Sequence, residues 1–204
     1  MAGIDEMGVT NQGWGVCGFT STFYALYNRP DRPAQIINAN QAFRVLAEIK
    51  TFLKMLQADG EIQKLNDIEA FTQSFGNRGE GQNYAQWTIE SYITKINGSV
   101  NKSEQEIVND AMFGIAIPPH VLQDYLKRAW DIDSTATWIT GTGFAGEGII
   151  GVKSTDEEDM TLYNGLCHYM YQSNNKIYSW GRQFSSIQEA DSDFRLVLAV
   201  AFDT

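Results

Sequence analysis

The chain has 204 residues, 43% of them hydrophobic, and a formal net charge of −10 at pH 7. This length and composition can bury a sizeable core within one domain. With more Asp and Glu than Lys and Arg, the chain has no basic stripe to neutralise phosphates. Nucleic acid and anionic membranes are therefore not expected as its main partners.

The sequence contains no run of 18 apolar residues and no basic, apolar leader at its start. We therefore expect neither a membrane span nor a signal peptide, and a location either in the cytoplasm or outside it by a signal-independent route. The two cysteines, Cys17 and Cys167, do not make a disulfide scaffold and suit a reducing compartment. Because the only histidines are His120 and His168, we predict no metal site, and we expect no other cofactor.

Residues 1–16 are predicted to form an extended entry and a Gly-rich turn, followed by a helix from Cys17 to about residue 28. A thiol at the start of a helix lies in a partial positive field and among backbone N–H groups without helical partners. Both features favour the thiolate, the nucleophilic form of cysteine. Gln12 can place its amide beside the sulfur as a donor to an oxyanion, and Trp14 is expected near the substrate cleft.

The sequence of the next half of the chain, to residue 130, predicts helices. Apolar residues recur at steps of three and four from about residue 39 to 58 and, more weakly, from 61 to 75. A third periodic stretch runs from Tyr84 to a stop at Asn97-Gly98. Ser103 and Glu106 form a capping box for a helix to about residue 112, and Pro118-Pro119 begins a further helix through Trp130.

After Asp131 the segments become short, β-branched or aromatic, and are separated by Gly, Asn, Asp and Ser, which predicts strands. The expected strands are 135–140, 148–152, 166–171, 176–180 and 195–202. Asn174-Asn175 is a good hairpin tip. The order of elements predicts one α+β domain, with a helical lobe at about 1–130 packed on a mainly antiparallel sheet at about 131–204.

Two further motifs are not interpreted as functional sites. The stretch 141–146 matches Gly-x-Gly-x-x-Gly, but a strand is expected after it where a dinucleotide site needs a helix, so we interpret it as a loop bordering the cleft or a hairpin connection. The acidic stretch 154–159 lacks the spacing of a calcium loop, and we interpret it as a solvated turn.

A cysteine nucleophile needs a partner that can hold a proton near neutral pH, and histidine is the usual one. His120 lies in the first turn of a predicted helix, where an imidazolium opposes the helix dipole, so we interpret it as a surface or capping residue. His168 lies on a predicted strand, 151 residues after Cys17. Its alternative role is that of a buried histidine in the core.

These residues resemble the papain-like cysteine peptidases in two short stretches. The first is Asn11-Gln12-Gly13 with Cys17-Gly18-Phe19, and the second is Ser179-Trp180-Gly181 after His168. The separation of Cys17 and His168 is near the roughly 130–150 residues of papain relatives. The resemblance implies a papain-like fold in which Cys17 is the nucleophile, His168 the base and Gln12 the oxyanion donor, while Trp180 shields the base from water.

The sequence departs from this family in two ways. Gln12 is one residue closer to the cysteine than in papain, and Tyr178 occupies the position of the Asn that orients the histidine. The orienting group can be Tyr178, Ser179, a backbone carbonyl or nothing. Catalysis by a Cys–His pair is still possible without the Asn, or the site is degenerate.

The resemblance therefore implies a cysteine peptidase or amidase. One alternative is an acyltransferase or deamidase that uses the same site, and another is an inactive papain-like protein that only binds a partner. The expected partners are a protein or peptide substrate and an inhibitor or immunity protein. Since no pro-segment precedes the nucleophile, we expect control by delivery, by an inhibitor or by narrow substrate choice, as in a bacterial effector or toxin.

Overall fold

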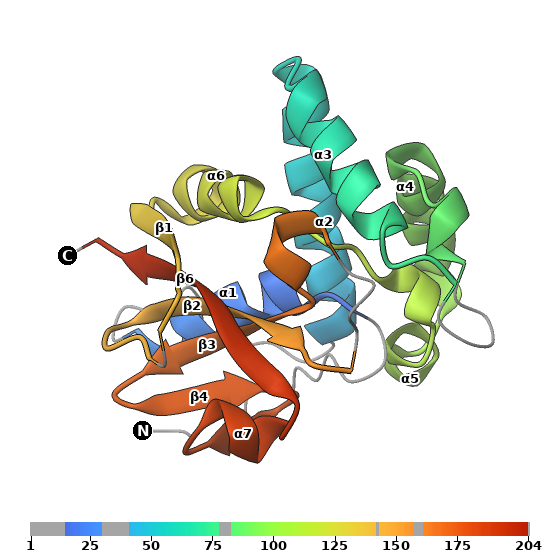
Figure 1. Ribbon diagram of the computed structural model, residues 1–204. Coiled ribbons are helices and arrows are strands. Elements are labelled where there is room, and N and C mark those ends of the chain that lie inside the picture. Colours follow the sequence, from blue (N-terminus) through green and yellow to red (C-terminus); the bar gives the residue numbers. More distant parts are fainter. Residues whose placement is uncertain (1–14, 30–40, 78–82, 142, 157–160, 204) are drawn as a thin grey trace.

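A computed structural model describes residues 15–29, 41–77, 83–141, 143–156 and 161–203. Helices from the first part of the chain pack against a six-stranded antiparallel sheet formed by the last part (Figure 1). The predicted α+β class is confirmed. Among the described helices, none is long and apolar enough to cross a membrane.

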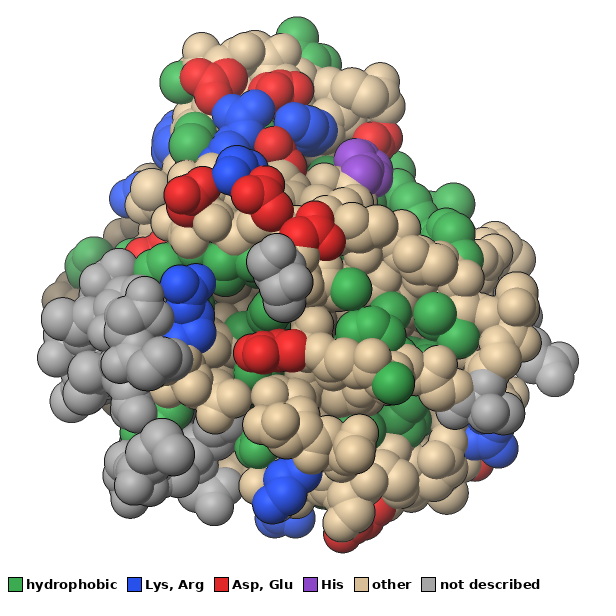
Figure 2. Space-filling view, turned by 90° about the vertical axis from the view of Figure 1, so that its left-hand side faces the viewer, with side chains coloured by type: hydrophobic (Ala, Val, Ile, Leu, Met, Phe, Trp, Pro, Cys, Tyr) green, Lys and Arg blue, Asp and Glu red, His purple; other side chains and the backbone are tan. Residues whose placement is uncertain are grey.

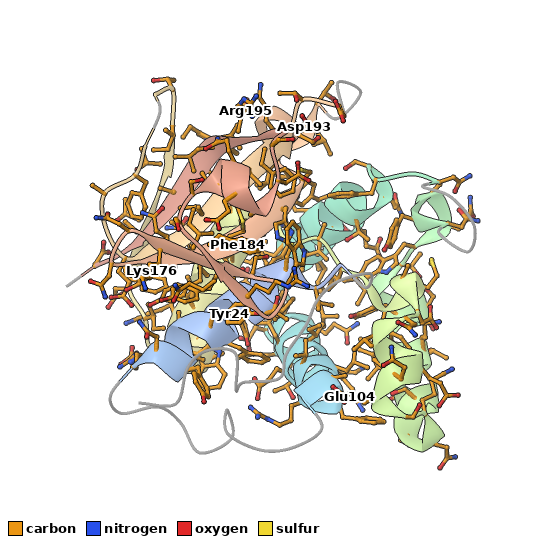
Figure 3. The ribbon with its side chains drawn as sticks, turned by 90° about the horizontal axis from the view of Figure 1, so that it is seen from below. Tyr24, Glu104, Lys176, Phe184, Asp193 and Arg195 are labelled. Carbon is orange, nitrogen blue, oxygen red and sulfur yellow. The ribbon has the colours of Figure 1, made fainter. Side chains whose placement is uncertain are left out.

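Helix α1, Cys17–Asn28, crosses one face of the sheet and is covered from the other side by helices (Figures 1 and 3). The residues from Gly18 to Tyr27 are all buried. A helix that is buried on every side lies in the middle of a core rather than at its surface. The predicted start and end of this helix are confirmed, and its burial holds the cysteine at a defined place.

The remaining helical elements follow the predicted order. They are α2 (Gln41–Ala58), α3 (Ile62–Gln73), the 3-10 turn η3 (Tyr84–Gln86), α4 (Ile89–Asn97), η4 (Gly98–Asn101), α5 (Glu104–Val108), η5 (Ala111–Phe113) and α6 (Pro119–Trp130). The capping box of Ser103 and Glu106 is present, and α6 begins at Pro118-Pro119 as predicted.

Two predicted helices are shorter than expected. The stretch from residue 84 to 97 divides at Thr88, whose extended backbone and capping box with Ser91 begin α4 anew. The helix after Ser103 ends at Val108 instead of about residue 112, because the Asp110 side chain accepts a hydrogen bond from the N–H of Met112 and starts a separate turn. In both places a local capping residue overrides the apolar periodicity.

The sheet has the strand order β1-β6-β2-β3-β4-β5, and all neighbouring pairs are antiparallel. Its strands are β1 (Ser134–Trp138), β2 (Gly148–Ser154), β3 (His168–Ser173), β4 (Lys176–Ser179), β5 (Arg182–Phe184) and β6 (Phe194–Phe202). The short strand β5, the 3-10 turn η6 (Leu162–Gly165) and the short helix α7 (Ile187–Ala190) were not predicted. Each element is too short for its apolar residues to show the spacing of a helix or a strand.

Alternating residues of β3 face opposite sides of the sheet. Tyr169 and Tyr171 belong to the large core shared with α1 and the other helices. Met170 belongs to a smaller cluster on the other face, which His168 joins through ring contacts with Phe194 and Trp180. The imidazole therefore lies on the face of the sheet opposite to the one that α1 covers, at the end of β3 where the backbone of Tyr169 approaches Cys17.

Charged side chains of both signs gather over the top of the helical part (Figure 2). Arg128 of α6 forms ion pairs with Asp59, Glu61 and Asp124, and Lys64 of α3 pairs with Glu61 and Asp124. This network ties the turn between α2 and α3 to α6. Surface pairs of this kind contribute about 0–1 kcal/mol each, so the core, not the network, supplies most of the stability.

The sheet provides a test of its own packing. A Cβ at Gly148 would lie 2.3 Å from the carbonyl oxygen of Val200, a backbone atom held within the sheet. We expect Gly148→Ala to lower the free energy of unfolding by about 2 kcal/mol or more, measured by urea titration. Gly98→Ala is the matched control because no heavy atom lies within 4 Å of its added Cβ. Equal stability of the two variants would contradict this packing.

Candidate active site

His168 is held by its neighbours on three sides. Its Nε2 lies 2.8 Å from the Oγ of Ser179, which is buried at the end of β4. Its ring stacks on Trp180, with centroids 4.9 Å apart and planes 21° apart, and on Phe194 at 5.7 Å. This arrangement leaves Nδ1 as the ring nitrogen that can exchange a proton with another group.

Cys17 is the first residue of α1 and is partly exposed. The backbone N–H groups of Tyr169, Gly18 and Cys17 itself favour the thiolate. Tyr169 directly follows His168 in β3, so α1 brings the sulfur to the strand that carries the imidazole. Cys17 and His168 both line one pocket.

This pocket has a volume of about 100 Å³. It opens between the start of α1, the start of β3, the end of α3 and the segment before α6. Its lining residues are Gly15, Cys17, Gly18, Phe71, Thr72, Phe75, Tyr84, Ile115, Ala116, Ile117, Leu166, Cys167, His168 and Tyr169. We refer to it as the cysteine pocket.

The hydroxyl groups of the cysteine pocket are occupied by bonds to the backbone. Thr72 Oγ1 accepts from the N–H of Ala116 at 3.0 Å and donates to the same residue's carbonyl at 3.3 Å. Tyr84 donates to the carbonyl of Ala111 at 2.6 Å, and Tyr169 donates to that of Ile117 at 2.9 Å. The pocket wall therefore presents an apolar surface to any molecule that enters it.

Burial determines the protonation of both candidate catalytic groups. It raises the pKa of the Cys17 thiol to about 11, against the opposing effect of the nearby backbone N–H groups. It also lowers the pKa of His168 to about 3. The backbone N–H groups at the helix start lower the thiol pKa, as expected, but loss of water outweighs them. At neutral pH the site holds a thiol and a neutral imidazole.

The hydrogen bond that orients His168 comes from Ser179. Tyr178, the other candidate for this role, packs its ring against Tyr171 with centroids 5.6 Å apart. Residues 178 and 179 are consecutive in β4 and so face opposite sides of the sheet. The alternation places the Ser179 hydroxyl on the side of His168.

Trp180 lies in an unfavourable backbone conformation. It forms with Gly181 the two-residue turn between β4 and β5, and both have positive φ, at 50° and 73°. The preceding hairpin uses Asn174 and Asn175 at φ 51° and 58°, as its sequence predicts. Asn tolerates this region, whereas a bulky side chain there is strained by about 1–2 kcal/mol. Strain of this kind is often found at functional sites, and here it places the indole over His168.

Gln12 and Trp14, the predicted oxyanion donor and cleft aromatic, lie outside the described residues. His120 does not line the cysteine pocket; its half-exposed ring lies with Nε2 3.0 Å from Asp67 Oδ2. Within the described ranges, no group of three or more His, Cys, Asp or Glu residues could hold a metal ion.

The pocket residues that come from the helical part of the chain could not be predicted from the sequence. Phe71, Phe75 and Tyr84 lie within or at the ends of apolar periodic stretches, where core residues are also expected. Nothing local distinguishes an aromatic that lines a pocket from one that fills a core, since both need an apolar environment. Cys167 was likewise not expected beside Cys17, although it lines the same pocket.

A second pocket, of about 450 Å³, lies between the loop at 141–146 and the segment around α7. Gly141, Gly143 and Phe144 line it, and the side-chain amide of Gln172 donates to the carbonyl of Phe144 at 2.6 Å. Strand β2 follows this loop, so the helix that a dinucleotide site requires is replaced by a strand. Ser185, Ser186, Gln188 and Arg195 contribute polar groups on the opposite side.

The chain was compared with protein-family models, with curated proteins and with solved structures. None of the three comparisons found a match.

Proposed function

We propose that this protein is a cysteine-dependent hydrolase of the papain-like type that cleaves amide bonds in proteins or peptides. One observation carries the proposal: Cys17, at the start of α1, lines the same pocket as His168, which is bonded to Ser179 and covered by Trp180. A nucleophile, a base and a group that orients the base are the parts that covalent amide hydrolysis requires.

The proposed reaction has two stages. His168 Nδ1 takes the thiol proton while the Cys17 sulfur attacks the substrate carbonyl carbon, and the imidazolium then gives that proton to the leaving amine. A water molecule hydrolyses the resulting thioester, with His168 again accepting and returning a proton. The Cys17 backbone N–H and the Gln12 side chain are the proposed donors to the oxyanion.

The low pKa of His168 and the high pKa of Cys17 imply that the thiol gives up its proton only during attack. A neutral imidazole is available as a base at every pH well above 3. Between pH 3 and pH 11 the neutral thiol and the neutral imidazole are the dominant forms. A rate that depends on proton transfer from one to the other during attack therefore does not change with pH in this range. A pH-independent reactivity of Cys17 is the signature of this mechanism.

The cysteine pocket suits an aliphatic substrate side chain. Its wall hydroxyls are already bonded to backbone groups, so a polar group entering it would lose water without finding a partner. Its volume of about 100 Å³ is below the roughly 150 Å³ of apolar cavities that hold benzene. We propose that a side chain the size of valine or leucine enters it.

A second candidate function is binding without catalysis. The neutral thiol and imidazole, together with Ser179 in place of the usual Asn, favour it because neither group carries a charge before a ligand arrives.

Acyl transfer or deamidation at the same site differs from peptide cleavage only in the acceptor or the amide attacked. Mass spectrometry of a susceptible protein separates these reactions by a cut chain, a crosslink or a small gain in mass.

The proposal is tested by alkylating the native protein with iodoacetamide from pH 5 to 9 and mapping the adducts. Cys17 is expected to react at a rate that stays within about threefold over this range, because its proton passes to His168. Cys167 lines the same pocket and serves as the internal control; its rate should rise tenfold per pH unit, as for a thiol that must lose its proton to solvent. A tenfold rise per unit at both cysteines would favour binding without catalysis.

A further inference from the structure

Tyr24 joins the helix that carries Cys17 to the turn that holds Trp180. The backbone N–H of Gly181 donates to the Tyr24 hydroxyl oxygen, at 2.6 Å, and the Tyr24 side chain is 1% exposed. Tyr24 follows Cys17 by seven residues, which is about two helical turns or 10 Å along α1. Figure 3 labels Tyr24 on α1 and Phe184 on β5, the strand that follows this turn.

The hydroxyl of Tyr24 provides a hydrogen-bond acceptor for the backbone N–H of Gly181, which the sheet does not. Ser179 and Arg182 are the last residues paired across β4 and β5, so the N–H of Gly181 lies outside the ladder. The turn is closed by Trp180 in a left-handed conformation, which a tryptophan does not favour. A buried hydrogen bond at the next residue helps to hold this conformation, and with it the indole that packs on His168, Phe184 and Phe194.

We propose that Tyr24 is a positioning residue of the active site: its bond to Gly181 fixes the turn bearing Ser179 and Trp180 relative to the helix bearing Cys17. This inference rests on the proposed function for its catalytic meaning. Its structural content, that Tyr24 sets the surroundings of His168 through Trp180, does not depend on catalysis. Tyr24 itself touches neither the thiol nor the substrate in this scheme.

The expected consequence of breaking the bond follows from what surrounds His168. The titratable residues that line the cysteine pocket with it are Cys17, Tyr84, Cys167 and Tyr169, and the rings packed on it are Trp180 and Phe194. Burial by this neutral surround is what lowers the pKa of His168. If the turn relaxes and Trp180 leaves the imidazole, water reaches the ring and the pKa rises toward its ordinary value.

The experiment compares Tyr24→Phe with the wild type and with Tyr92→Phe. The first variant keeps the ring and removes the acceptor for Gly181; the second removes a matched buried bond, from Tyr92 to the carbonyl of Phe113 at 2.8 Å. We expect the pKa of His168, followed by NMR of its ring protons, to rise by at least one unit in Tyr24→Phe alone. The alkylation rate of Cys17 at pH 6 should fall 10- to 100-fold, as a small misplacement of reacting groups can cause.

A second variant tests whether Tyr24 acts through Trp180. Trp180→Asn gives the turn an Asn-Gly sequence that tolerates positive φ and removes the stacked indole. It should raise the pKa of His168 as Tyr24→Phe does, and the double variant should show no further rise.

An unchanged His168 titration in Tyr24→Phe, an equal change in Tyr92→Phe, or additive effects in the double variant would each overturn the assignment. The titration does not depend on catalysis, so it tests the role of Tyr24 even where Cys17 shows no pH-independent alkylation, which is the outcome that contradicts the proposed function.

Discussion

Replacing His168 with glutamine is expected to slow alkylation of Cys17 at pH 6 by about 10²- to 10⁴-fold, the usual contribution of a general base. Glutamine is close in size to histidine and can still bond to Ser179, but it cannot take the thiol proton. The thiol must then lose its proton to solvent, and its pKa of about 11 keeps the thiolate rare at pH 6. The pH-independent rate should therefore become one that rises tenfold per pH unit between pH 6 and 9.

His120→Gln is the matched control for this result. It removes the other histidine of the chain, whose half-exposed ring pairs with Asp67 away from the cysteine pocket. The rate and pH dependence of Cys17 alkylation should be the same in this variant as in the wild type. A small effect of His168→Gln, or an equal effect of the two changes, would exclude His168 as the base.

The second large effect is expected in the pH dependence of stability. Burial lowers the pKa of His168 from an ordinary value of 6.5 to about 3 in the folded protein. Between these values the unfolded chain binds a proton that the folded protein does not, so acid favours unfolding. The contribution of His168 is fully present above pH 6.5 and is lost as the pH falls toward 3, by up to about 1.4 kcal/mol per pH unit.

Urea unfolding of the wild type and of His168→Gln at pH 7, 6, 5 and 4 measures this contribution. The two proteins share every carboxylate, so the difference between their free energies of unfolding isolates the histidine. The wild type should lose stability faster than the variant below pH 6.5, and the two curves should converge or cross. Parallel curves would mean that His168 is solvated in the folded state and that Trp180 does not exclude water from it.

The helices and the sheet follow from local rules. Apolar residues at steps of three and four predicted α2 and α6, Ser103 and Glu106 predicted the start of α5, and Asn174-Asn175 predicted a hairpin. Two helix ends were misplaced because Thr88 and Asp110 make capping bonds that periodicity does not register. Strand β5 was missed because its three residues are positioned by pairing with β4.

Some residues of the candidate site could be predicted from the sequence and others could not. Cys17 and His168 could be singled out because their chemistry is rare in this sequence and because their neighbours resemble a known family. Phe71 and Tyr84 could not, since a residue that lines a pocket has the same composition and spacing as one that fills a core. The choice of Ser179 over Tyr178 was open in the sequence and depends on which side of β4 each residue faces.

Local patterns in the sequence predict the α+β class, the order of the elements, the hairpin at Asn174-Asn175 and two candidates for nucleophile and base. The protonation of Cys17 and His168 depends on tertiary packing, because burial depends on what distant segments pack against each group. Tertiary packing also decides that Trp180 adopts a strained conformation, which Tyr24 helps to hold from a helix far away in the chain. Local patterns record the preferences of each residue, whereas solvation and strain arise from contacts between segments remote in sequence.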